Sequence, residues 1–212
     1  LYSFFQSNKI LFKSQYGFRK GHSTEYAALE LIENIIKEVD SGEVPLAIFL
    51  DLSRAFDTLD HSILLHKLNY YGVTDVSLNL LESYLIGRQQ YVEFEDFASP
   101  MISLETGVPQ GSILGPQLFL IYMNDIYCSS DINNFILYAD DTTISSTLKI
   151  SNTSNGLSPD DINHELTHVT DWLKLNKLSL NYSKSKAMLF HNRQRHVNEP
   201  DIFLDGSPLT FV

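Results

Sequence analysis

The stretch NFILYADDTTISS, Asn134–Ser146, has the pattern of a strand, a tight turn and a second strand. Apolar residues run up to Tyr138, and a threonine-rich segment follows the turn. Two adjacent aspartates, Asp140 and Asp141, stand at the turn, where aspartate is common because its short side chain bonds its own backbone. Taken alone, the pair indicates an ordinary turn. The alternative, half of a metal site, needs a further carboxylate nearby.

Asp51 is the candidate for that further carboxylate. It directly follows the apolar run Pro45–Leu50, which is typical of a strand buried on both faces. A carboxylate there is unfavourable unless it is paired, bound to a cation or solvated at the strand exit. If this strand neighbours the one before Asp140, three carboxylates converge at one sheet edge, and such oxygen ligands suit Mg²⁺. Spacing along the chain does not show whether they meet.

Composition limits the class of protein. The 212 residues are 43% hydrophobic, which predicts one folded domain or one large piece of a domain. The formal charge of −11 has the wrong sign for a free-standing nucleic-acid binder. Either polyanions are not the partner, or the basic surface lies elsewhere, or some of the acidic residues hold cations. Cys128 is the only cysteine, so no intrachain disulfide is possible.

Apolar residues at helical spacing alternate with short strand patterns, which predicts helices packed against one sheet, an α+β fold. Segments 89–94 and 101–105 alternate like an exposed hairpin, and 107–115 is rich in turn residues. No apolar run is long enough to span a membrane. The predicted helices cover about 24–40, 62–71, 76–86, 116–127 and 159–177.

One motif points to a different chemistry. HELTH, His164–His168, matches H-E-x-x-H, which on a helix brings two histidines together as zinc metalloproteases require. An extended version would have glycine and histidine at positions where Asp171 and Lys174 stand. The short motif lacks this confirming context, so a protease is the disfavoured alternative, and a surface pair of histidines is the simpler explanation.

Five blocks occur in a fixed order: QYGFRKGHST (15–24), FLDLSRAFDTLDH (49–61), GVPQGSILGPQLF (107–119), YADDTTI (138–144) and WLKLNKLSLNYSKSK (172–186). Together they closely resemble the reverse transcriptase domain of non-LTR (LINE-type) retrotransposons, over nearly the whole chain.

The resemblance implies a right-hand polymerase palm with part of the fingers and no thumb. Residues 1–44 would be the remainder of the fingers, and 45–212 mostly palm with a fingers-like insertion around 73–106. Because the chain begins at Leu1, it looks like a fragment.

The resemblance also assigns the carboxylates. Asp51 matches the first metal-binding aspartate, and Asp140 and Asp141 match the later pair, with Asp140 the more direct ligand. The backbone carbonyl of Leu52 would help to hold the metal on the nucleotide side. Two Mg²⁺ ions are implied, with Mn²⁺ as a possible substitute. Phe56 matches a steric gate that excludes a 2′-hydroxyl, although ordinary core packing is the simpler explanation of the ring taken alone.

Further matches concern substrate contacts. Gln110 matches the glutamine that lies against the incoming nucleotide and template, and the glycines Gly107 and Gly111 permit a close backbone approach. Lys184, with Lys186 as the fallback, matches a late lysine that gives a proton to pyrophosphate or contacts a phosphate, and a solvated face near a strand is the alternative for both lysines. Arg19 and Lys20 are candidate contacts to template or triphosphate, with a surface role as the alternative.

The implied activity is an RNA-directed DNA polymerase that acts on dNTPs, a DNA primer and an RNA template. Other expected partners are the remaining parts of a polyprotein, namely upstream fingers or endonuclease and a downstream thumb. No membrane is expected, and the location would be intracellular, in nucleus or cytoplasm. The alternative is a catalytically inactive remnant or a nucleic-acid-binding module.

Overall fold

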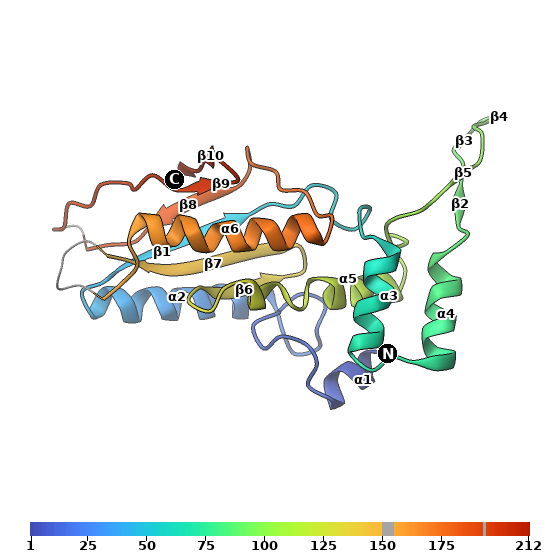
Figure 1. Ribbon diagram of the computed structural model, residues 1–212, viewed down its shortest axis with the longest axis horizontal. Coiled ribbons are helices and arrows are strands. Elements are labelled where there is room, and N and C mark those ends of the chain that lie inside the picture. Colours follow the sequence, from blue (N-terminus) through green and yellow to red (C-terminus); the bar gives the residue numbers. More distant parts are fainter. Residues whose placement is uncertain (150–154, 193) are drawn as a thin grey trace.

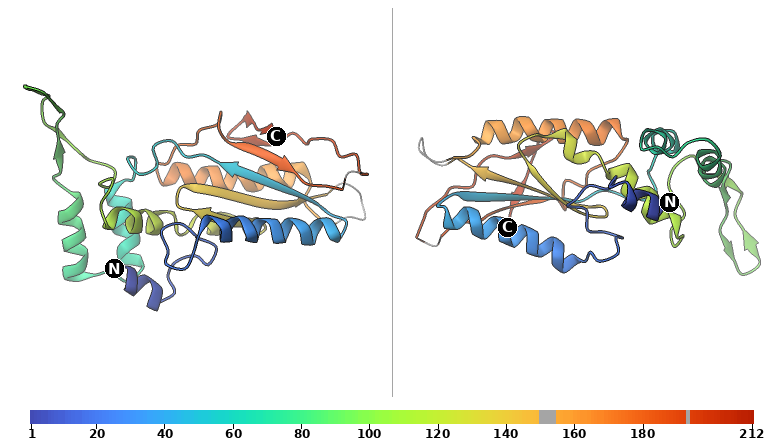
Figure 2. Two further views of the ribbon diagram at one scale, coloured as in Figure 1. Left: turned by 180° about the vertical axis from the view of Figure 1, so that it is seen from behind. Right: turned by 90° about the horizontal axis from the view of Figure 1, so that it is seen from below.

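The computed structural model describes residues 1–149, 155–192 and 194–212. A five-stranded sheet in the order β11-β8-β1-β7-β6 forms its centre, and the two longest helices lie on opposite faces of it (Figures 1 and 2). The predicted α+β fold is confirmed. The strands are β1 (Val44–Leu50), β6 (Asn134–Tyr138), β7 (Asp141–Leu148), β8 (Lys186–Leu189) and β11 (Thr210–Phe211), and the two helices are α2 (Thr24–Asp40) and α6 (Pro159–Leu175).

Strand β1 lies at the centre of the sheet because its continuous apolar run can be buried on both faces. It pairs antiparallel with β7 on one side and with β8 on the other. On the β7 side, Leu50 lies opposite Thr142, so the end of β1 meets the start of β7. This register places the residue after β1 beside the β6–β7 turn.

The two covering helices bury their faces to different extents. Helix α6 begins with a capping box between Ser158 and Asp161, and it buries Ile162, Leu166, Val169 and Leu173 completely. Helix α2 is capped by Ser23 but contains no fully buried residue. Large apolar side chains of α2 therefore remain exposed, namely Tyr26, Leu29, Ile32 and Ile36.

A smaller lobe extends beyond one end of the sheet (Figure 1). Helices α3 (His61–Tyr70) and α4 (Asp75–Leu85) lead into the exposed ribbon that the alternating pattern predicts. Its strands are β2 (Gln89–Gln90), β3 (Glu93–Phe94), β4 (Phe97–Ala98) and β5 (Ile102–Ser103). The remaining short elements are α1 (Tyr2–Ser7), β9 (Phe203–Leu204) and β10 (Ser207–Pro208).

The single helix predicted over 116–127 is wrong at both ends. Helix α5 covers Leu114–Met123, and a separate 3₁₀ turn, η1, covers Ile126–Ser129. At the start, Ser112 Oγ accepts a hydrogen bond from the N–H of Gly115 at 2.9 Å, which lets the helix begin before Pro116. At the end, the side chain of Asn124 bonds both the N–H of Phe12 and the carbonyl of Ile10, so tertiary contacts stop the helix there.

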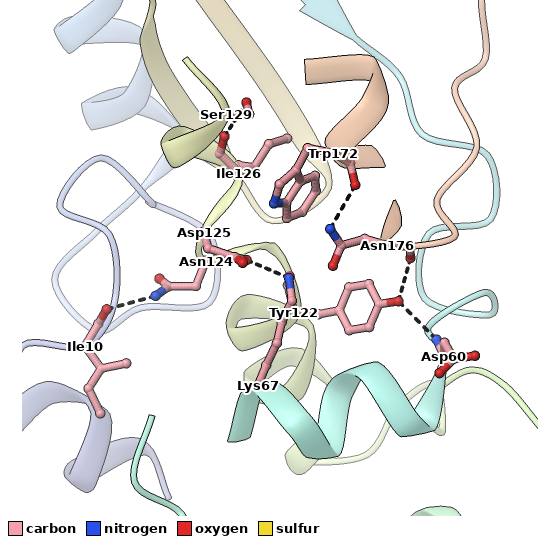
Figure 3. A network of polar contacts seen from close by, with 10 residues as sticks. All are labelled: Ile10, Asp60, Lys67, Tyr122, Asn124, Asp125, Ile126, Ser129, Trp172 and Asn176. Atoms are coloured by element: carbon pink, nitrogen blue, oxygen red, sulfur yellow. Dashed lines mark hydrogen bonds and ion pairs between the residues drawn. The ribbon is translucent and has the colours of Figure 1, made fainter. Parts of the chain in front are cut away.

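A buried lysine joins α3 to α5 and α6 (Figure 3). Lys67 Nζ donates to the Tyr122 carbonyl and to Asp125 Oδ1, each at 2.6 Å, and lies 4.6 Å from the ring centroid of Trp172. Tyr122 OH in turn donates to the carbonyl of Asn176 at 2.6 Å. Burial lowers the pKa of Lys67, while the charge and hydrogen bond of Asp125 oppose that shift. None of the described helices has the length and apolar character needed to cross a membrane.

Candidate active site

The carboxylates predicted from sequence lie at one edge of the sheet. Tyr138 pairs with Asp141, which leaves Ala139 and Asp140 as a two-residue turn between β6 and β7. The β1–β7 register ends at the Leu50–Thr142 pair, so Asp51 follows β1 at the same end of the sheet at which Asp141 begins β7. The strand pairing that the sequence left open is therefore present.

These carboxylates influence one another. Burial raises the pKa of Asp141, and the negative charges of Asp140 and Asp51 raise it further. The three are not packed as a closed cluster, since within the described residues only a different group brings three potential ligand atoms within 4.8 Å of one another. Carboxylate oxygens are nevertheless the donors that Mg²⁺ prefers, so this chemistry fits the implied cations.

The backbone around Asp51 is held by the segment before β8. The N–H of Asn181 donates to the carbonyl of Asp51 at 2.8 Å, and the N–H of Ser53 donates to the carbonyl of Ser179 at 2.8 Å. Between these two bonds, the Leu52 carbonyl accepts no hydrogen bond from the described residues. It is therefore free to act as the backbone ligand that the family resemblance implies.

The two candidate lysines lie close to Asp51 along this same segment. Lys184 is exposed in the turn before β8, and Lys186 is the first residue of β8, opposite Phe49. Ser185 lies between the lysines, and its hydroxyl accepts a hydrogen bond from the N–H of Asp51 at 3.2 Å. This proximity is compatible with either lysine, and the choice between them stays a prediction.

Phe56 is packed between two other aromatic rings. Its ring stacks on Phe119, with centroids 4.3 Å apart. Phe18 approaches it edge-on at 6.1 Å. Phe119 is fully buried and Phe18 is exposed, so Phe56 lies at the border between the core and the surface. Core packing and a role as a steric gate are both compatible with this position.

Gln110 is held by a residue that sequence reasoning missed. Its Nε2 donates to Asp57 Oδ1 at 2.8 Å. The two residues line a cavity of about 520 Å³, together with Arg88, Gln90, Leu104, Thr106, Gly107, Val108 and Pro109. The glutamine therefore faces a space beside the residues that follow Asp51.

The two glycines near Gln110 have different physical roles. Gly107 has φ +79°, and a Cβ there would lie 2.7 Å from the carbonyl oxygen of Asp57, so its close approach is to the protein backbone. Gly111 has φ +77° with open space around it, so only its conformation favours glycine. At Gly107 the space is taken by the backbone of Asp57, and at Gly111 it is open, so a close approach to substrate stays a prediction.

Arg19 and Lys20 are placed differently from each other. Arg19 Nη1 donates to the carbonyls of Phe12 and Gln15, at 2.8 and 2.9 Å, and burial lowers its pKa. These bonds favour a structural role for Arg19. Lys20 is exposed, so its predicted contact with nucleic acid stays open.

The sequence also missed the residues that hold the aspartate turn. Gln15 Oε1 accepts hydrogen bonds from the N–H groups of Gly17 and Ala139, at 2.8 and 3.0 Å. Ala139 is left-handed, with φ 55°. Gln15 belongs to the first of the five blocks, but nothing in that block indicates a bond to a residue 124 positions later.

The HELTH motif is helical as predicted, in the middle of α6. Its His164, Glu165 and His168 are the three residues whose ligand atoms lie within 4.8 Å of one another, and the described chain adds no fourth residue to them. Lys174, where an extended motif would have histidine, is bound to Asp205. The wider context of a zinc protease is not found.

Comparison with known proteins identifies the family. The model of the reverse transcriptase (RNA-dependent DNA polymerase) family matches residues 2–203. A probable RNA-directed DNA polymerase from the Drosophila melanogaster transposon BS is 33% identical over 84% of this chain, and the one from the X-element is 29% identical over 98%. The enzyme of the mobile element jockey from the same species is 27% identical over 93%. The chain spans 20–22% of the length of these relatives.

The fold is shared with solved telomerases. Telomerase from Candida tropicalis matches with a TM-score of 0.61 and 13% identity, over 84% of this chain and 30% of the telomerase. Telomerase from Candida albicans matches with a TM-score of 0.60 and 14% identity, over 95% of this chain and 34% of the telomerase. The palm-type α+β fold implied by the motifs is thereby confirmed. From its motif order, its family match and its retrotransposon relatives, this chain belongs to the reverse transcriptase family.

Proposed function

We propose that this chain carries the nucleotidyl-transfer site of an RNA-directed DNA polymerase of the non-LTR retrotransposon type. The observation that supports it most directly is the meeting of Asp51 with the Asp140–Asp141 turn at one sheet edge, in a member of the reverse transcriptase family. In the reaction, the 3′-hydroxyl of a DNA primer attacks the α-phosphate of a dNTP and pyrophosphate leaves.

The aspartates are proposed to hold the cations whose positive charge this reaction needs. Asp51, Asp140, Asp141 and the Leu52 carbonyl are the proposed ligands of two Mg²⁺ ions, with Mn²⁺ as a substitute. When bound, such ions supply the positive charge that favours a nucleophilic primer oxygen and stabilises the leaving pyrophosphate. The contribution of the protein is mainly position and electrostatics.

Other side chains are proposed to select and orient the nucleotide. Phe56 excludes the 2′-hydroxyl of a ribonucleotide by its bulk, and its packing keeps the ring in place. Gln110 lies against the incoming nucleotide and the template, with Gly111 beside it, and Lys184 or Lys186 donates a proton to pyrophosphate. Base pairing with the RNA template provides the sequence specificity, so the protein needs no base-reading motif.

The proposed partners follow from this reaction. They are an RNA template, a DNA primer and dNTPs, and the shared fold with telomerase solved in complex with telomeric RNA supports the nucleic-acid partner. With a formal charge of −11, the chain needs basic surface from the remaining parts of a polyprotein to hold nucleic acid. Lys20 is the exposed candidate contact within this chain.

We assign residues 1–44 to the fingers and 45–212 mostly to the palm, with the insertion around 73–106 as a further fingers-like element. The lobe of α3, α4 and the ribbon, which stands beyond the end of the sheet (Figure 1), supports a separate insertion in this region.

Primer extension on an RNA template tests the proposal. The chain is compared with a version that carries the flanking sequences of its element, each with Mg²⁺ present. Asp140→Ala should reduce extension about a thousandfold or more, because it removes a proposed metal ligand. Each tenfold loss in rate corresponds to about 1.4 kcal/mol of transition-state stabilisation. Asp131→Ala, which changes an exposed aspartate on the loop after η1, is the matched control. If the flanked version extends no primer, the chain is an inactive remnant or a binding module.

A further inference from the structure

The backbone of the aspartate turn is paired with a distant N-terminal segment. The N–H of Leu137 donates to the carbonyl of Ser14 at 2.8 Å, and the N–H of Tyr16 donates to the carbonyl of Leu137 at 2.7 Å. Gln15 and Leu137 therefore form a parallel bridge. The segment from Ser14 to Gly17 acts as a short additional strand beside the end of β6, immediately before the turn.

The side chain of Gln15 reaches past this bridge to the turn itself. It is 1% exposed, and its Oε1 accepts from the N–H of Ala139 at 3.0 Å as well as from the N–H of Gly17. Ala139 is the first residue of the two-residue turn and is left-handed, so its amide direction sets the course of the chain into Asp140. A buried acceptor shared by two amides is a strong constraint, because leaving those donors unpaired is unfavourable.

Gly17 allows this close approach. A Cβ at position 17 would lie 2.3 Å from the backbone nitrogen of Ala139, a distance that real atoms do not adopt. The segment is also held from outside. Arg19 bonds the carbonyl of Gln15, and Glu30 of α2 accepts hydrogen bonds from the hydroxyls of Ser14 and Tyr16.

We propose that Gln15 is a positioning residue for Asp140 and Asp141, acting through the amide of Ala139. Its carboxamide fixes the turn so that adjacent aspartates, which would face opposite ways on a straight strand, are presented toward Asp51. The inference rests on the proposed function, because it gives a reason for holding this turn rigidly. A purely structural role would instead stabilise the whole sheet equally.

The test measures the turn directly in the full chain. Gln15→Met keeps a similar length but loses the acceptor. Amide hydrogen exchange should accelerate about tenfold at Ala139 in Gln15→Met, the effect of losing one hydrogen bond of ordinary strength. Exchange at β1 and α6 should be unchanged, and Mg²⁺ titrations should saturate at higher concentration.

The proposal is overturned if Ala139 exchanges as in wild type, or if all strands of the sheet lose protection to the same extent. If Gln15→Met does not fold, Gln15→Asn replaces it, since it keeps the amide but is one methylene too short to reach. These measurements require no catalysis. If the version with flanking sequences extends no primer but the exchange pattern is present, the proposed function is contradicted and the positioning role stays intact.

A second inference comes from the HELTH segment, which the polymerase site does not use. His164 and His168 are one helical turn apart, with ring centroids 4.7 Å apart. A nitrogen of each ring and a carboxylate oxygen of Glu165 all lie within 4.8 Å of one another. Both histidines are exposed, and the capping box at Ser158 stabilises the start of this helix.

One of the three groups is already oriented. Glu165 Oε2 accepts a hydrogen bond from Ser130 Oγ at 2.6 Å, and Glu165 Oε1 lies 4.0 Å from His164 Nδ1. Two imidazoles and one carboxylate are donors that suit borderline transition cations better than Mg²⁺. We propose that His164, His168 and Glu165 bind one such cation, Zn²⁺ first, with water completing its coordination and with no peptidase role.

Calorimetric titration of the full chain with ZnCl₂ tests this site. One Zn²⁺ should bind, Mg²⁺ should not compete, and His164→Asn or His168→Asn should weaken binding at least tenfold. Ser130→Ala should weaken it less, because it only frees Glu165. His191→Asn, which changes another exposed histidine, is the control that should bind as wild type. Absence of saturable binding, or unchanged binding in the double histidine variant, overturns the assignment.

Discussion

The ring of Phe56 stacks on the ring of Phe119, with the centroids 4.3 Å apart and the planes inclined by 18°. Phe119 is fully buried in α5, so the proposed steric gate is supported from the hydrophobic core. Moving a side chain that is packed in this way would lose packing contacts. The ring therefore stays in place when a 2′-hydroxyl approaches, which is the property that a gate needs.

Shortening the gate should therefore relax sugar selection. We expect Phe56→Val to raise rNTP incorporation relative to dNTP by about tenfold or more, equivalent to about 1.4 kcal/mol of lost discrimination. Single-nucleotide extension with each substrate measures the ratio. Phe56→Tyr, which keeps the ring, is the matched control. An unchanged ratio in Phe56→Val would assign the ring to core packing alone.

Asp141→Asn should increase stability while reducing activity. Burial, followed by the charges of Asp140 and Asp51, raises the pKa of Asp141. A carboxyl group with a raised pKa binds more protons in the folded state, so its charged form destabilises the fold above that pKa. At pH 7 the variant should unfold at a higher temperature. The gain in the free energy of unfolding should be less than about 1 kcal/mol, because the carboxylate is exposed.

The gain should shrink as the pH falls through the raised pKa toward the ordinary value of 3.8, where wild-type Asp141 becomes neutral. Thermal unfolding across pH measures this, with Asp131→Asn as a control expected to show no such trend. Mg²⁺ should stabilise wild type more than the variant, because only wild type retains the full set of ligands. A variant less stable than wild type at pH 7 contradicts the prediction.

Asp57 should tune nucleotide binding through Gln110. Its Oδ1 accepts the hydrogen bond from Gln110 Nε2 at 2.8 Å. Without this acceptor, we expect Asp57→Ala to raise KM for dNTP by about threefold to tenfold with little change in kcat, which matches one exposed hydrogen bond. Asp57→Asn keeps an acceptor oxygen and should stay close to wild type. Steady-state extension kinetics decide, and equal KM values for all three proteins would leave the contact without a role.

Removing Asp125 and removing Lys67 should destabilise the fold to different extents. Asp125→Ala leaves the Lys67 ammonium buried without its carboxylate, so we expect a loss of about 3 kcal/mol in the free energy of unfolding. Lys67→Met should be milder, because the Asp125 side chain is 37% exposed and can be hydrated. The methionine also retains packing against Trp172.

Urea denaturation of both single variants and the double variant measures these values and the coupling between the residues. The double variant should be more stable than Asp125→Ala. A coupling near zero would show that the ion pair in Figure 3 contributes nothing to the fold.

Much of the architecture followed from local patterns. The alternation and turn residues of NFILYADDTTISS predicted β6, the turn and β7, and the apolar run after Pro45 predicted β1. The helices predicted over 24–40 and 159–177 begin where α2 and α6 begin, at Thr24 and Pro159. These features depend on neighbouring residues, whose dihedral preferences and periodicity are written in the sequence itself.

Contacts between distant segments were not predictable in this way. Helix α5 ends early because Asn124 bonds to residues 10 and 12, and α2 buries no residue fully although its apolar pattern is regular. Both results depend on what packs beside a helix, and helical spacing contains no information about that neighbour.

By itself, the sequence indicated the types of most elements and, through the order of its motifs, the family, and it predicted Asp51, Asp140 and Asp141 as metal ligands. The tertiary structure decided that β1 pairs with β7, which puts Asp51 and Asp141 at the same end of the sheet, and that Gln15 accepts a hydrogen bond from the turn between β6 and β7. The physical reason is that strand pairing and buried hydrogen bonds satisfy donors, acceptors and apolar surface over the whole chain at once, whereas local conformation is set residue by residue.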